Sequence, residues 1–340
     1  MTIKSLLLGS AAALAAVSGA QAADAIVAAE PEPMEYVRVC DAFGTGFFYI
    51  PGSETCLKIG GYVRFETGFG QDKSGRSDWD SFSRAQFHLD ARSDTELGTL
   101  RGFAEFRANG DTGMGGANAA SSANLGSGAF VLQAFIELGG LKVGKFFSEW
   151  DNDLSGDADL LVTNSLFNSI QYTFGDDALK AAISIDELEG LTSKAGETDN
   201  NVGITGFVAG KLGVVSATLL GSYDVDSEES AIRGIVYADI GPGTLGLSGV
   251  WASGENAYYA ESDWAVAAEY AFKITDKLTL TPGGQYLDSV AFGNNDAWLA
   301  GLTVDYKITD GLNAKAYVQY YDEDNSDGKT TGYFRLTRSF

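Results

Sequence analysis

The chain has 340 residues and a formal net charge of −23 at pH 7, because 46 Asp and Glu outnumber 23 Lys and Arg. This charge argues against nucleic acid or an anionic membrane surface as a partner. Hydrophobic residues make up 45% of the chain, which excludes a disordered protein, and 43 Gly, 20 Phe and 15 Tyr against 5 Pro favour many strands joined by tight turns.

Residues 1–22 have the layout of a secretory signal peptide. Lys4 precedes an apolar run, Leu6–Val17, and the small-residue site Ala20-Gln21-Ala22 follows. The run is too short to span a bilayer, and no other stretch has about 18 consecutive apolar residues. The sequence therefore predicts an exported chain without a transmembrane helix, with a net charge of −24 once Lys4 is removed.

Residues 23–56 are typical of a lead-in segment. Glu30-Pro31-Glu32-Pro33 is acidic and has no apolar periodicity. The two cysteines of the chain, Cys40 and Cys56, both lie in this segment. Because exported proteins meet an oxidising compartment, we expect a disulfide between them, with a contribution of about 3 kcal/mol from loop closure.

From Leu57 onward the pattern changes to a period of two. One face carries Ile59, Gly61, Val63, Phe65 and Phe69, and the other carries Lys58, Tyr62, Arg64 and Glu66. Similar runs occur at 84–92, 100–107, 264–273 and 298–307. This period is typical of strands with one apolar and one charged face.

Short turns that contain Gly, Asp or Asn alternate with longer polar loops. The short turns are at 94–98, 139–140, 175–177, 211–213, 241–243, 275–277 and 309–311. The long loops are at 71–78, 109–127, 148–165, 188–200, 224–230, 253–262, 288–296 and 322–329. Together they join sixteen strands.

A soluble β-sandwich would also show alternating strands, but three features favour a membrane barrel. The strands are about ten residues long, and the unequal connections match the two sides of an outer membrane. Aromatic residues suited to interfacial girdles gather near the ends of the apolar faces, at Phe69, Trp251, Trp264, Phe272, Trp298, Tyr306 and Tyr320. Phe340 ends the chain, and an even strand number lets the sheet close without free edges. Residues 57–340 are thus predicted to form an all-β, 16-stranded antiparallel transmembrane β-barrel.

Three segments carry a resemblance to a known family. Tyr-Val-Arg-Val-Cys-Asp-Ala-Phe-Gly at 36–44, Phe-Tyr-Ile-Pro-Gly-Ser-Glu-Thr-Cys-Leu-Lys-Ile-Gly-Gly-Tyr-Val-Arg at 48–64 and Arg-Leu-Thr-Arg-Ser-Phe at 335–340 resemble the start and end of mature alphaproteobacterial general porins of the rhizobial and Brucella type. The resemblance implies a homotrimeric outer-membrane channel for small hydrophilic solutes in a Gram-negative bacterium. It also implies contact with outer-membrane lipid and lipopolysaccharide, and Phe340 as a signal to the barrel-assembly machinery. Arg338 departs from the apolar residue common near such ends, and we expect it to snorkel to the interface.

Residues 148–165 connect the fifth and sixth predicted strands and form the third long loop. The loop carries five carboxylates and no basic residue, namely Glu149, Asp151, Asp153, Asp157 and Asp159. A packed core would bury them at high cost, whereas a water-filled space lined by positive charge would stabilise them. In the porins that the chain resembles, this loop folds into the barrel and narrows it.

Parity places basic residues on the charged face of the first three strands, namely Lys58, Arg64, Arg84, Arg92, Arg101 and Arg107. Across the lumen from the acidic loop, they would set up a transverse field that selects polar solutes by size and orients their dipoles. The alternative is that these charges only solvate a wide lumen and form local ion pairs.

The same loop allows a calcium hypothesis. Asp151, Asp153, Ser155 and Asp159 have the spacing of the first half of a calcium loop, but Val162 stands where the closing Glu would be.

An enzyme is a further alternative. His88 is the only histidine, and Gln86 and Asp90 do not complete a nucleophile-base-orienter set with it, although Ser81 and Ser83 are near. We therefore expect no cofactor and no reaction.

Two other kinds of barrel are alternatives to a general porin. A substrate-specific channel would show a row of aromatic residues in its lumen, for which Tyr62, Phe103 and Tyr237 are scattered inward candidates. A structural or adhesive barrel would have a closed lumen. We expect a passive channel with a modest cation preference at low salt, which fades as screening increases.

Overall fold

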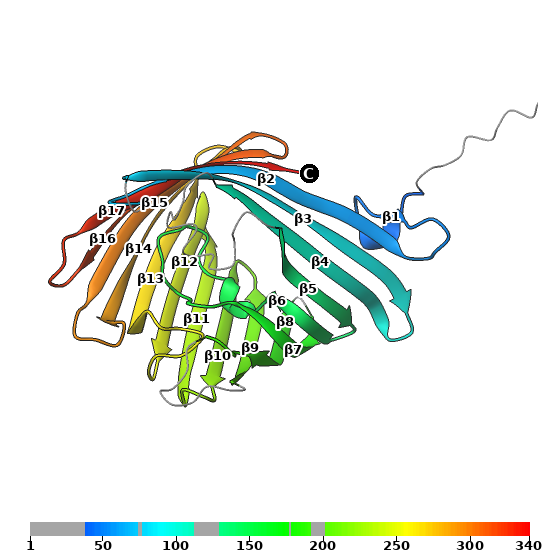
Figure 1. The fold of residues 1–340 in the computed structure, drawn as a ribbon, viewed down its shortest axis with the longest axis horizontal. Coiled ribbons are helices and arrows are strands. Elements are labelled where there is room, and N and C mark those ends of the chain that lie inside the picture. Colours follow the sequence, from blue (N-terminus) through cyan, green and yellow to red (C-terminus); the bar gives the residue numbers. More distant parts are fainter. Residues whose placement is uncertain (1–37, 74–76, 112–128, 177, 192–200) are drawn as a thin grey trace, which may run out of the picture. The chain divides into compact units, whose positions relative to one another are not determined.

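The computed structural model describes residues 38–73, 77–111, 129–176, 178–191 and 201–340 (Figure 1). Within Val39–Phe340, sixteen antiparallel strands form a closed ring in sequence order. They are β2 (Cys56–Phe69), β3 (Trp79–Thr95), β4 (Gly98–Asp111), β5 (Phe130–Leu138), β6 (Leu141–Phe147), β7 (Leu166–Gly175), β8 (Leu179–Glu187), β9 (Val202–Leu212), β10 (Val215–Asp224), β11 (Glu229–Ile240), β12 (Gly243–Ala252), β13 (Ser262–Lys273), β14 (Leu278–Val290), β15 (Ala297–Thr309), β16 (Leu312–Glu323) and β17 (Lys329–Ser339). The ring closes where Leu336 of β17 pairs with Phe65 of β2. The predicted sixteen-stranded β-barrel is confirmed.

The two faces of the sheet differ in chemistry because side chains alternate along each strand. The apolar face exposes large hydrophobic side chains, such as Ile59 (52%), Val63 (53%) and Phe65 (45%). The seven aromatic residues predicted for the strand ends are exposed on it as well. The polar face carries the charged and hydroxyl side chains. An apolar area of this extent needs an apolar surrounding.

Turn geometry follows the predicted alternation of short and long connections. Gly139 and Gly311, in two of the short turns, have φ angles of 59° and 71°, a left-handed conformation that glycine adopts without a Cβ clash. Parts of three long loops, 74–76, 112–128 and 192–200, lie outside the described residues, as does the predicted signal peptide. Among the residues described, no helix has the length and hydropathy to cross a membrane.

The predicted disulfide between Cys40 and Cys56 is present. It ties the segment before the ring to the first residue of β2. Between the cysteines lie one helical turn, η1 (Asp41–Phe43), and the two-residue strand β1 (Phe48–Tyr49), which pairs with β2. Phe47 is buried against the two cysteines. The disulfide is the main covalent support of a segment with few strand hydrogen bonds.

Replacing Cys40 and Cys56 with serine is expected to loosen this segment. The disulfide spans 16 residues, for which chain entropy predicts a stabilisation of about 3 kcal/mol. We expect chymotrypsin to cleave near Phe47 faster, while the barrel keeps its folded migration on unheated SDS gels. Equal cleavage rates in the variant, the parent and the reduced parent would contradict this role.

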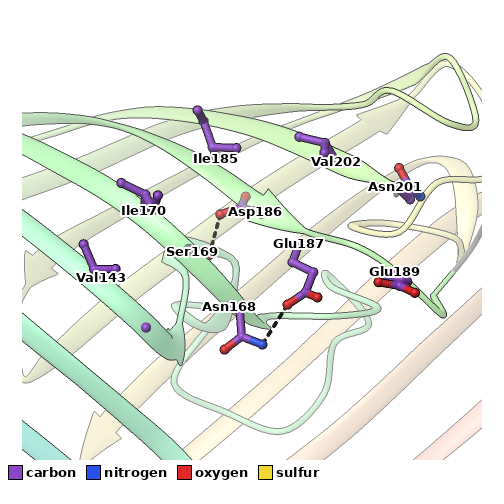
Figure 2. Close-up of a pocket in the computed structure, with 11 residues that line it drawn as sticks. Val143, Asn168, Ser169, Ile170, Ile185, Asp186, Glu187, Glu189, Asn201 and Val202 are labelled. Atoms are coloured by element: carbon purple, nitrogen blue, oxygen red, sulfur yellow. Dashed lines mark hydrogen bonds between the residues drawn. The ribbon is translucent and has the colours of Figure 1, made fainter. Parts of the chain in front are cut away.

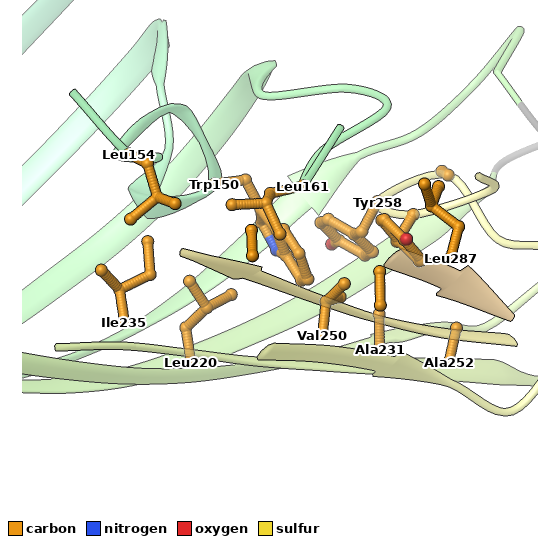
Figure 3. Close-up of a cluster of buried hydrophobic side chains, with 14 of the residues drawn as sticks. Trp150, Leu154, Leu161, Leu220, Ala231, Ile235, Val250, Ala252, Tyr258 and Leu287 are labelled. Atoms are coloured by element: carbon orange, nitrogen blue, oxygen red, sulfur yellow. The ribbon is translucent and has the colours of Figure 1, made fainter. Parts of the chain in front are cut away.

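The largest buried apolar cluster lies on the polar face of the sheet (Figure 3). It contains Trp150, Leu154 and Leu161 from the connection between β6 and β7, and Tyr258 from the connection between β12 and β13. These side chains pack on wall residues that include Leu220, Ile235 and Val250. Part of the polar face is therefore covered by two loops.

Candidate functional site

The connection between β6 and β7, residues 148–165, is called the acidic loop below. The Ser148 hydroxyl accepts a hydrogen bond from the Trp150 amide (3.4 Å) and caps the short helix η2 (Glu149–Asp151). The Ser148 amide donates to the Ser165 carbonyl at 2.7 Å, which joins the two ends of the loop. The base of the loop is therefore fixed at the ends of β6 and β7.

Trp150 anchors the first turn of the acidic loop. Its side chain is fully buried, and its indole N–H donates to Ser222 Oγ on β10 at 2.8 Å. The ring stacks on Tyr258, with 6.0 Å between centroids. A buried indole contributes a large apolar area and needs a partner for its N–H, and both conditions are met here. Apolar residues thus attach a loop that is acidic in composition.

Arg233 on β11 holds the backbone of the acidic loop. Its side chain is fully buried beside the Trp150 ring, 4.9 Å from the centroid. Its terminal nitrogens donate to the carbonyls of Trp150 (2.9 Å), Leu161 (3.2 Å), Glu149 (2.9 Å) and Asn152 (2.9 Å). A guanidinium suits this position because its donors form a rigid fork.

Arg233 was not among the site residues predicted from the sequence. Its neighbours in β11, Ile232 and Gly234, alternate with it, so parity alone places Arg233 on the polar face. Ala231 and Ile235 share that face and are buried apolar residues. A single arginine between apolar residues on a polar face was the available signal.

Glu269 on β13 and Gln285 on β14 hold the far part of the acidic loop. The Glu269 carboxylate accepts from the Ser155 amide (2.8 Å), Ser155 Oγ (2.5 Å) and the Gly156 amide (2.7 Å). A Cβ on Gly156 would lie 2.7 Å from Glu269 Oε2, so glycine permits this close approach. The Gln285 amide bonds to both the N–H and the carbonyl of Leu160.

Asp157 forms the tip of the acidic loop and contacts three strands. Its amide donates to Thr303 Oγ1 on β15 at 3.1 Å. Its carboxylate accepts from Tyr333 on β17 (2.7 Å) and pairs with Lys315 on β16 (3.2 Å). In the described structure, the hydrogen bonds between the acidic loop and the ring all end on β10–β17. The polar face of β2–β5 is not part of this attachment.

A second connection, residues 253–261, braces the acidic loop. Tyr258 is fully buried, and its hydroxyl donates to Asp186 on β8 at 2.8 Å. The Thr163 amide donates to the Tyr258 carbonyl (3.0 Å), and the Thr163 hydroxyl donates to Glu261 (2.8 Å). A polar loop was predicted here, without this contact.

The carboxylates of the acidic loop differ in protonation. Desolvation raises the pKa of Asp151, and the positive charges of Arg233 and Arg107 oppose that rise. Desolvation, with repulsion between neighbouring carboxylates, raises the pKa of Asp153 to about 6 and that of Asp159 to about 8. At neutral pH the loop therefore carries less negative charge than its composition suggests.

The six predicted basic residues share the polar face of β2–β4. They differ in their partners. Arg92 (2.7 Å) and Arg101 (3.0 Å) both pair with Asp90, and Arg101 also pairs with Glu137 (2.8 Å). The Lys58 ammonium lies 5.8 Å from the centre of the Phe47 ring. Arg64, Arg84 and Arg107 form no ion pair with any described residue. The alternative of local ion pairing therefore applies to part of this set.

The predicted calcium ligands point to other partners. Ser155 directs its hydroxyl to Glu269, and Asp151 accepts from Ser165 Oγ (2.9 Å). Among the described residues, there is no group of three or more acidic, His or Cys side chains that could hold a metal ion. Asp153 and Asp159 are near enough to repel each other. The calcium hypothesis gains no support from this arrangement.

His88 lies in an aromatic stack. Its ring is 5.4 Å from Phe103, which is 4.9 Å from Phe135. Asp90, the neighbouring carboxylate on this face, accepts from Arg92 and Arg101. It is therefore committed to the arginines and does not orient His88 as a catalytic base.

The three aromatic candidates for a solute track occupy different places. Phe103 belongs to the stack on β4. The Tyr62 hydroxyl on β2 donates to Gln86 at 2.8 Å, and the Tyr237 hydroxyl on β11 donates to the Asp153 carbonyl at 2.7 Å. The Tyr237 contact makes it part of the loop attachment. These three residues do not form one row.

A separate hollow of about 430 Å³ lies on β6–β9 (Figure 2). Its apolar part is formed by Val143, Ile170, Ile185 and Val202. Ser169 donates to Asp186 (2.6 Å) and Asn168 donates to Glu187 (2.8 Å), so polar groups at its edge bond to one another. Asp186 connects the hollow to the loops through Tyr258.

Known proteins similar to this chain include outer-membrane porins. The family model described as "Porin subfamily" matches residues 24–336. The chain is 45% identical to outer membrane protein IIIA of Rhizobium leguminosarum bv. viciae, over 98% of this chain and 93% of that protein. It is 36% identical to porin Omp2b of Brucella neotomae, over 100% of both. The trimer form of OmpT from Vibrio cholerae matches the fold with a TM-score of 0.64 at 14% identity, over 85% of this chain and 100% of that chain. The chain belongs to the porin subfamily.

Proposed function

We propose that this outer-membrane porin is a general diffusion channel whose acidic loop narrows the lumen opposite the arginines of β2–β4. The apolar face of the ring meets lipid, and small hydrophilic solutes pass along the polar face. Other members of the family are channels, and passage of solutes needs neither a cofactor nor a reaction.

The observation that carries the proposal is the reach of the acidic loop. It begins at β6 and bonds through Asp157 to β15, β16 and β17. In the closed ring, β16 is ten strands from β6 in one direction and six in the other. Because the contacts are all on the polar face, the loop crosses the space inside the ring. Because the loop is attached to β10–β17, we infer a water path between it and the arginines of β2–β4.

The charges on the two sides of this water path differ in sign. Desolvation raises the pKa of Asp151, and its carboxylate is close enough to Arg107 on β4 for the guanidinium to oppose that rise. Opposite charges across a narrow aqueous gap create a transverse field, which orients dipolar solutes and disfavours apolar ones. This supports a constriction that selects by size and polarity.

We also propose that the chain assembles as a homotrimer in lipid and lipopolysaccharide, inserted by the barrel-assembly machinery. The trimer form of OmpT has a similar fold. Phe340 exchanges backbone hydrogen bonds with Gly61 at the closing seam of the ring (3.0 and 3.1 Å), which suits a terminal assembly signal. Arg338 donates to the Gly311 carbonyl at a short turn, as a side chain that snorkels to the interface would.

Planar-bilayer recording of the purified porin tests the proposed function. We expect stepwise, ohmic conductance in KCl with a modest cation preference in dilute salt. Current that saturates with one sugar or amino acid would indicate a substrate-specific channel instead. The absence of conductance in correctly folded protein would indicate a closed structural barrel and contradict the proposal.

Cation preference is expected to rise with pH. The carboxyls of Asp153 and Asp159 have raised pKa values, about 6 and about 8. Each stays neutral below its pKa and becomes negative as the pH rises through it, so the K⁺ to Cl⁻ permeability ratio should increase from about pH 5 to about pH 9. Reversal potentials in a KCl gradient measure this ratio. Asp159→Asn should flatten the upper part of the curve, and a pH-independent parent would contradict the prediction.

A further inference from the structure

Arg64, Arg84 and Arg107 form a compact group on the polar face. Arg64 of β2 and Arg84 of β3 are directly paired across the two strands. Arg107 of β4 pairs with Gln86, and Asn109 pairs with Arg84, so Arg107 is the diagonal neighbour of Arg84. Such spacings correspond to about 5 Å between directly paired Cβ atoms and about 7–8 Å between diagonal neighbours. Three positive charges therefore lie on one small area.

Each of these arginines is held through its Nε atom by a neutral oxygen. Arg64 donates to Thr337 Oγ1 (3.3 Å), Arg84 to Asn109 Oδ1 (2.8 Å) and Arg107 to Gln86 Oε1 (2.7 Å). A guanidinium has five N–H donors, four of them on its terminal nitrogens. Holding the Nε atom fixes the plane of the group and leaves terminal donors available, although Arg107 also shares a hydrogen bond with Tyr62. The described residues provide no carboxylate within ion-pair distance of any of the three.

Carboxylates on the neighbouring strands are committed elsewhere. Glu66 pairs with Arg335 at 2.5 Å. Glu105 accepts from the amide groups of Gln86 (2.6 Å) and Gln133 (2.7 Å). Asp90 is shared by the two arginines nearer the short-turn ends of β3 and β4. Glu105 and Asp151 act on Arg107 only beyond ion-pair distance, and Glu66 acts on Arg64 in the same way. The three-arginine group therefore keeps donors that a mobile anion can contact directly.

We propose that Arg64, Arg84 and Arg107 form an oxyanion site in the channel, with phosphate and phosphorylated small solutes as its ligands. The inference rests on the proposed function, because it requires the polar face to line a water-filled lumen. Phosphate fits the group because it carries nearly two negative charges at neutral pH and presents several acceptor oxygens to planar forks. Chloride has no such geometry, and a monocarboxylate has half the charge. The site would let anionic nutrients enter a channel whose overall charge favours cations.

The test titrates inorganic phosphate into planar bilayers that contain the full mature porin in KCl. We expect phosphate to reduce the Cl⁻-carried current with a saturating concentration dependence, and acetate to need a much higher concentration. Replacing Arg64, Arg84 and Arg107 together with Gln should raise the half-saturating phosphate concentration by about tenfold or more, since hydrogen bonds between charged groups are lost. The single variant Arg84→Gln should give a smaller shift in the same direction. Lys180→Gln, which removes one positive charge from the polar face of β8, is its matched control and should leave the titration unchanged.

The outcomes separate this inference from the proposed function. A parent that conducts but shows no saturation with phosphate overturns the oxyanion site and leaves the diffusion channel intact. A parent that does not conduct overturns the channel itself. Equal half-saturation for acetate and phosphate, or an equal shift in Lys180→Gln and Arg84→Gln, also overturns the site, because the effect would then reflect general charge. Should the triple variant not fold, Arg84→Gln against Lys180→Gln decides the question alone.

Discussion

Replacing Arg233 with Met is expected to release the acidic loop from the wall and to raise both the conductance and the current noise of the channel. The substitution keeps an apolar stem beside Trp150 but removes the donors to the carbonyls of Glu149, Trp150, Asn152 and Leu161. A buried carbonyl left without a partner costs roughly 1–3 kcal/mol. The Glu149 carbonyl keeps the Asn152 amide (3.2 Å), whereas three carbonyls lose the donor that Arg233 supplies. The first turn is then held less firmly, so the loop should move on the timescale of the recording.

Single-channel recording at fixed voltage measures this effect. Arg233→Lys keeps the charge but not the rigid fork, and should give an intermediate result. Arg338→Met is a suitable control, because Arg338 contacts the Gly311 carbonyl in a short turn and not the loop. The attachment described for Arg233 would be wrong if its Met variant kept the open-channel noise and conductance of the parent while folding normally.

Neutralising Asp151, Asp153, Asp157 and Asp159 together as Asn is expected to shift the channel away from cations. A unit charge about 4 Å from a passing ion changes its energy by about 1 kcal/mol in water, which is about a fivefold change in local concentration. The K⁺ to Cl⁻ permeability ratio should fall by about that factor, because the substitution also removes Asp157 from Lys315, which keeps Asp305 at 3.7 Å. Neutralising Asp322, Glu323, Asp324 and Asp327 replaces the same number of carboxyl groups near the β16–β17 loop and should have a smaller effect.

Most of the barrel could be predicted because each strand and each turn is specified by a pattern within its own short stretch of sequence. Period-two alternation identifies each strand and its faces, and turn residues separate them. The order of connections then places the acidic loop after the fifth strand of the ring. The disulfide between Cys40 and Cys56 follows from the cysteine count and the export signal. Nothing in these inferences requires knowing which strands face one another across the ring.

The attachment of the acidic loop could not be predicted, because it depends on which strands face one another across the ring. Arg233 and Glu269 lie more than 70 residues from the loop residues that they bind, and only closure of the ring brings them together. The 253–261 loop was predicted to be polar although it contains Tyr258 and Tyr259, both of which are fully buried. An apolar pair inside an otherwise polar loop was the signal that the loop packs against something.

The arginines of β2–β4 were also predicted only in part. Parity placed Arg64, Arg84, Arg92, Arg101 and Arg107 on one face, and the strand register agrees. Parity says nothing about which arginines are neutralised, because that depends on cross-strand neighbours. Asp90 pairs with Arg92 and Arg101, so the unpaired charge is concentrated at the other three.

The central claim is that the acidic loop faces the arginines across the water path and sets ion selectivity. The reversal potential of single channels in a KCl gradient tests it most directly, with the four-Asn variant of the acidic loop measured beside the parent. We predict a cation-preferring parent and a variant whose reversal potential moves toward that of an anion-preferring channel. A variant that conducts and selects as the parent does would show that the acidic loop is not the constriction.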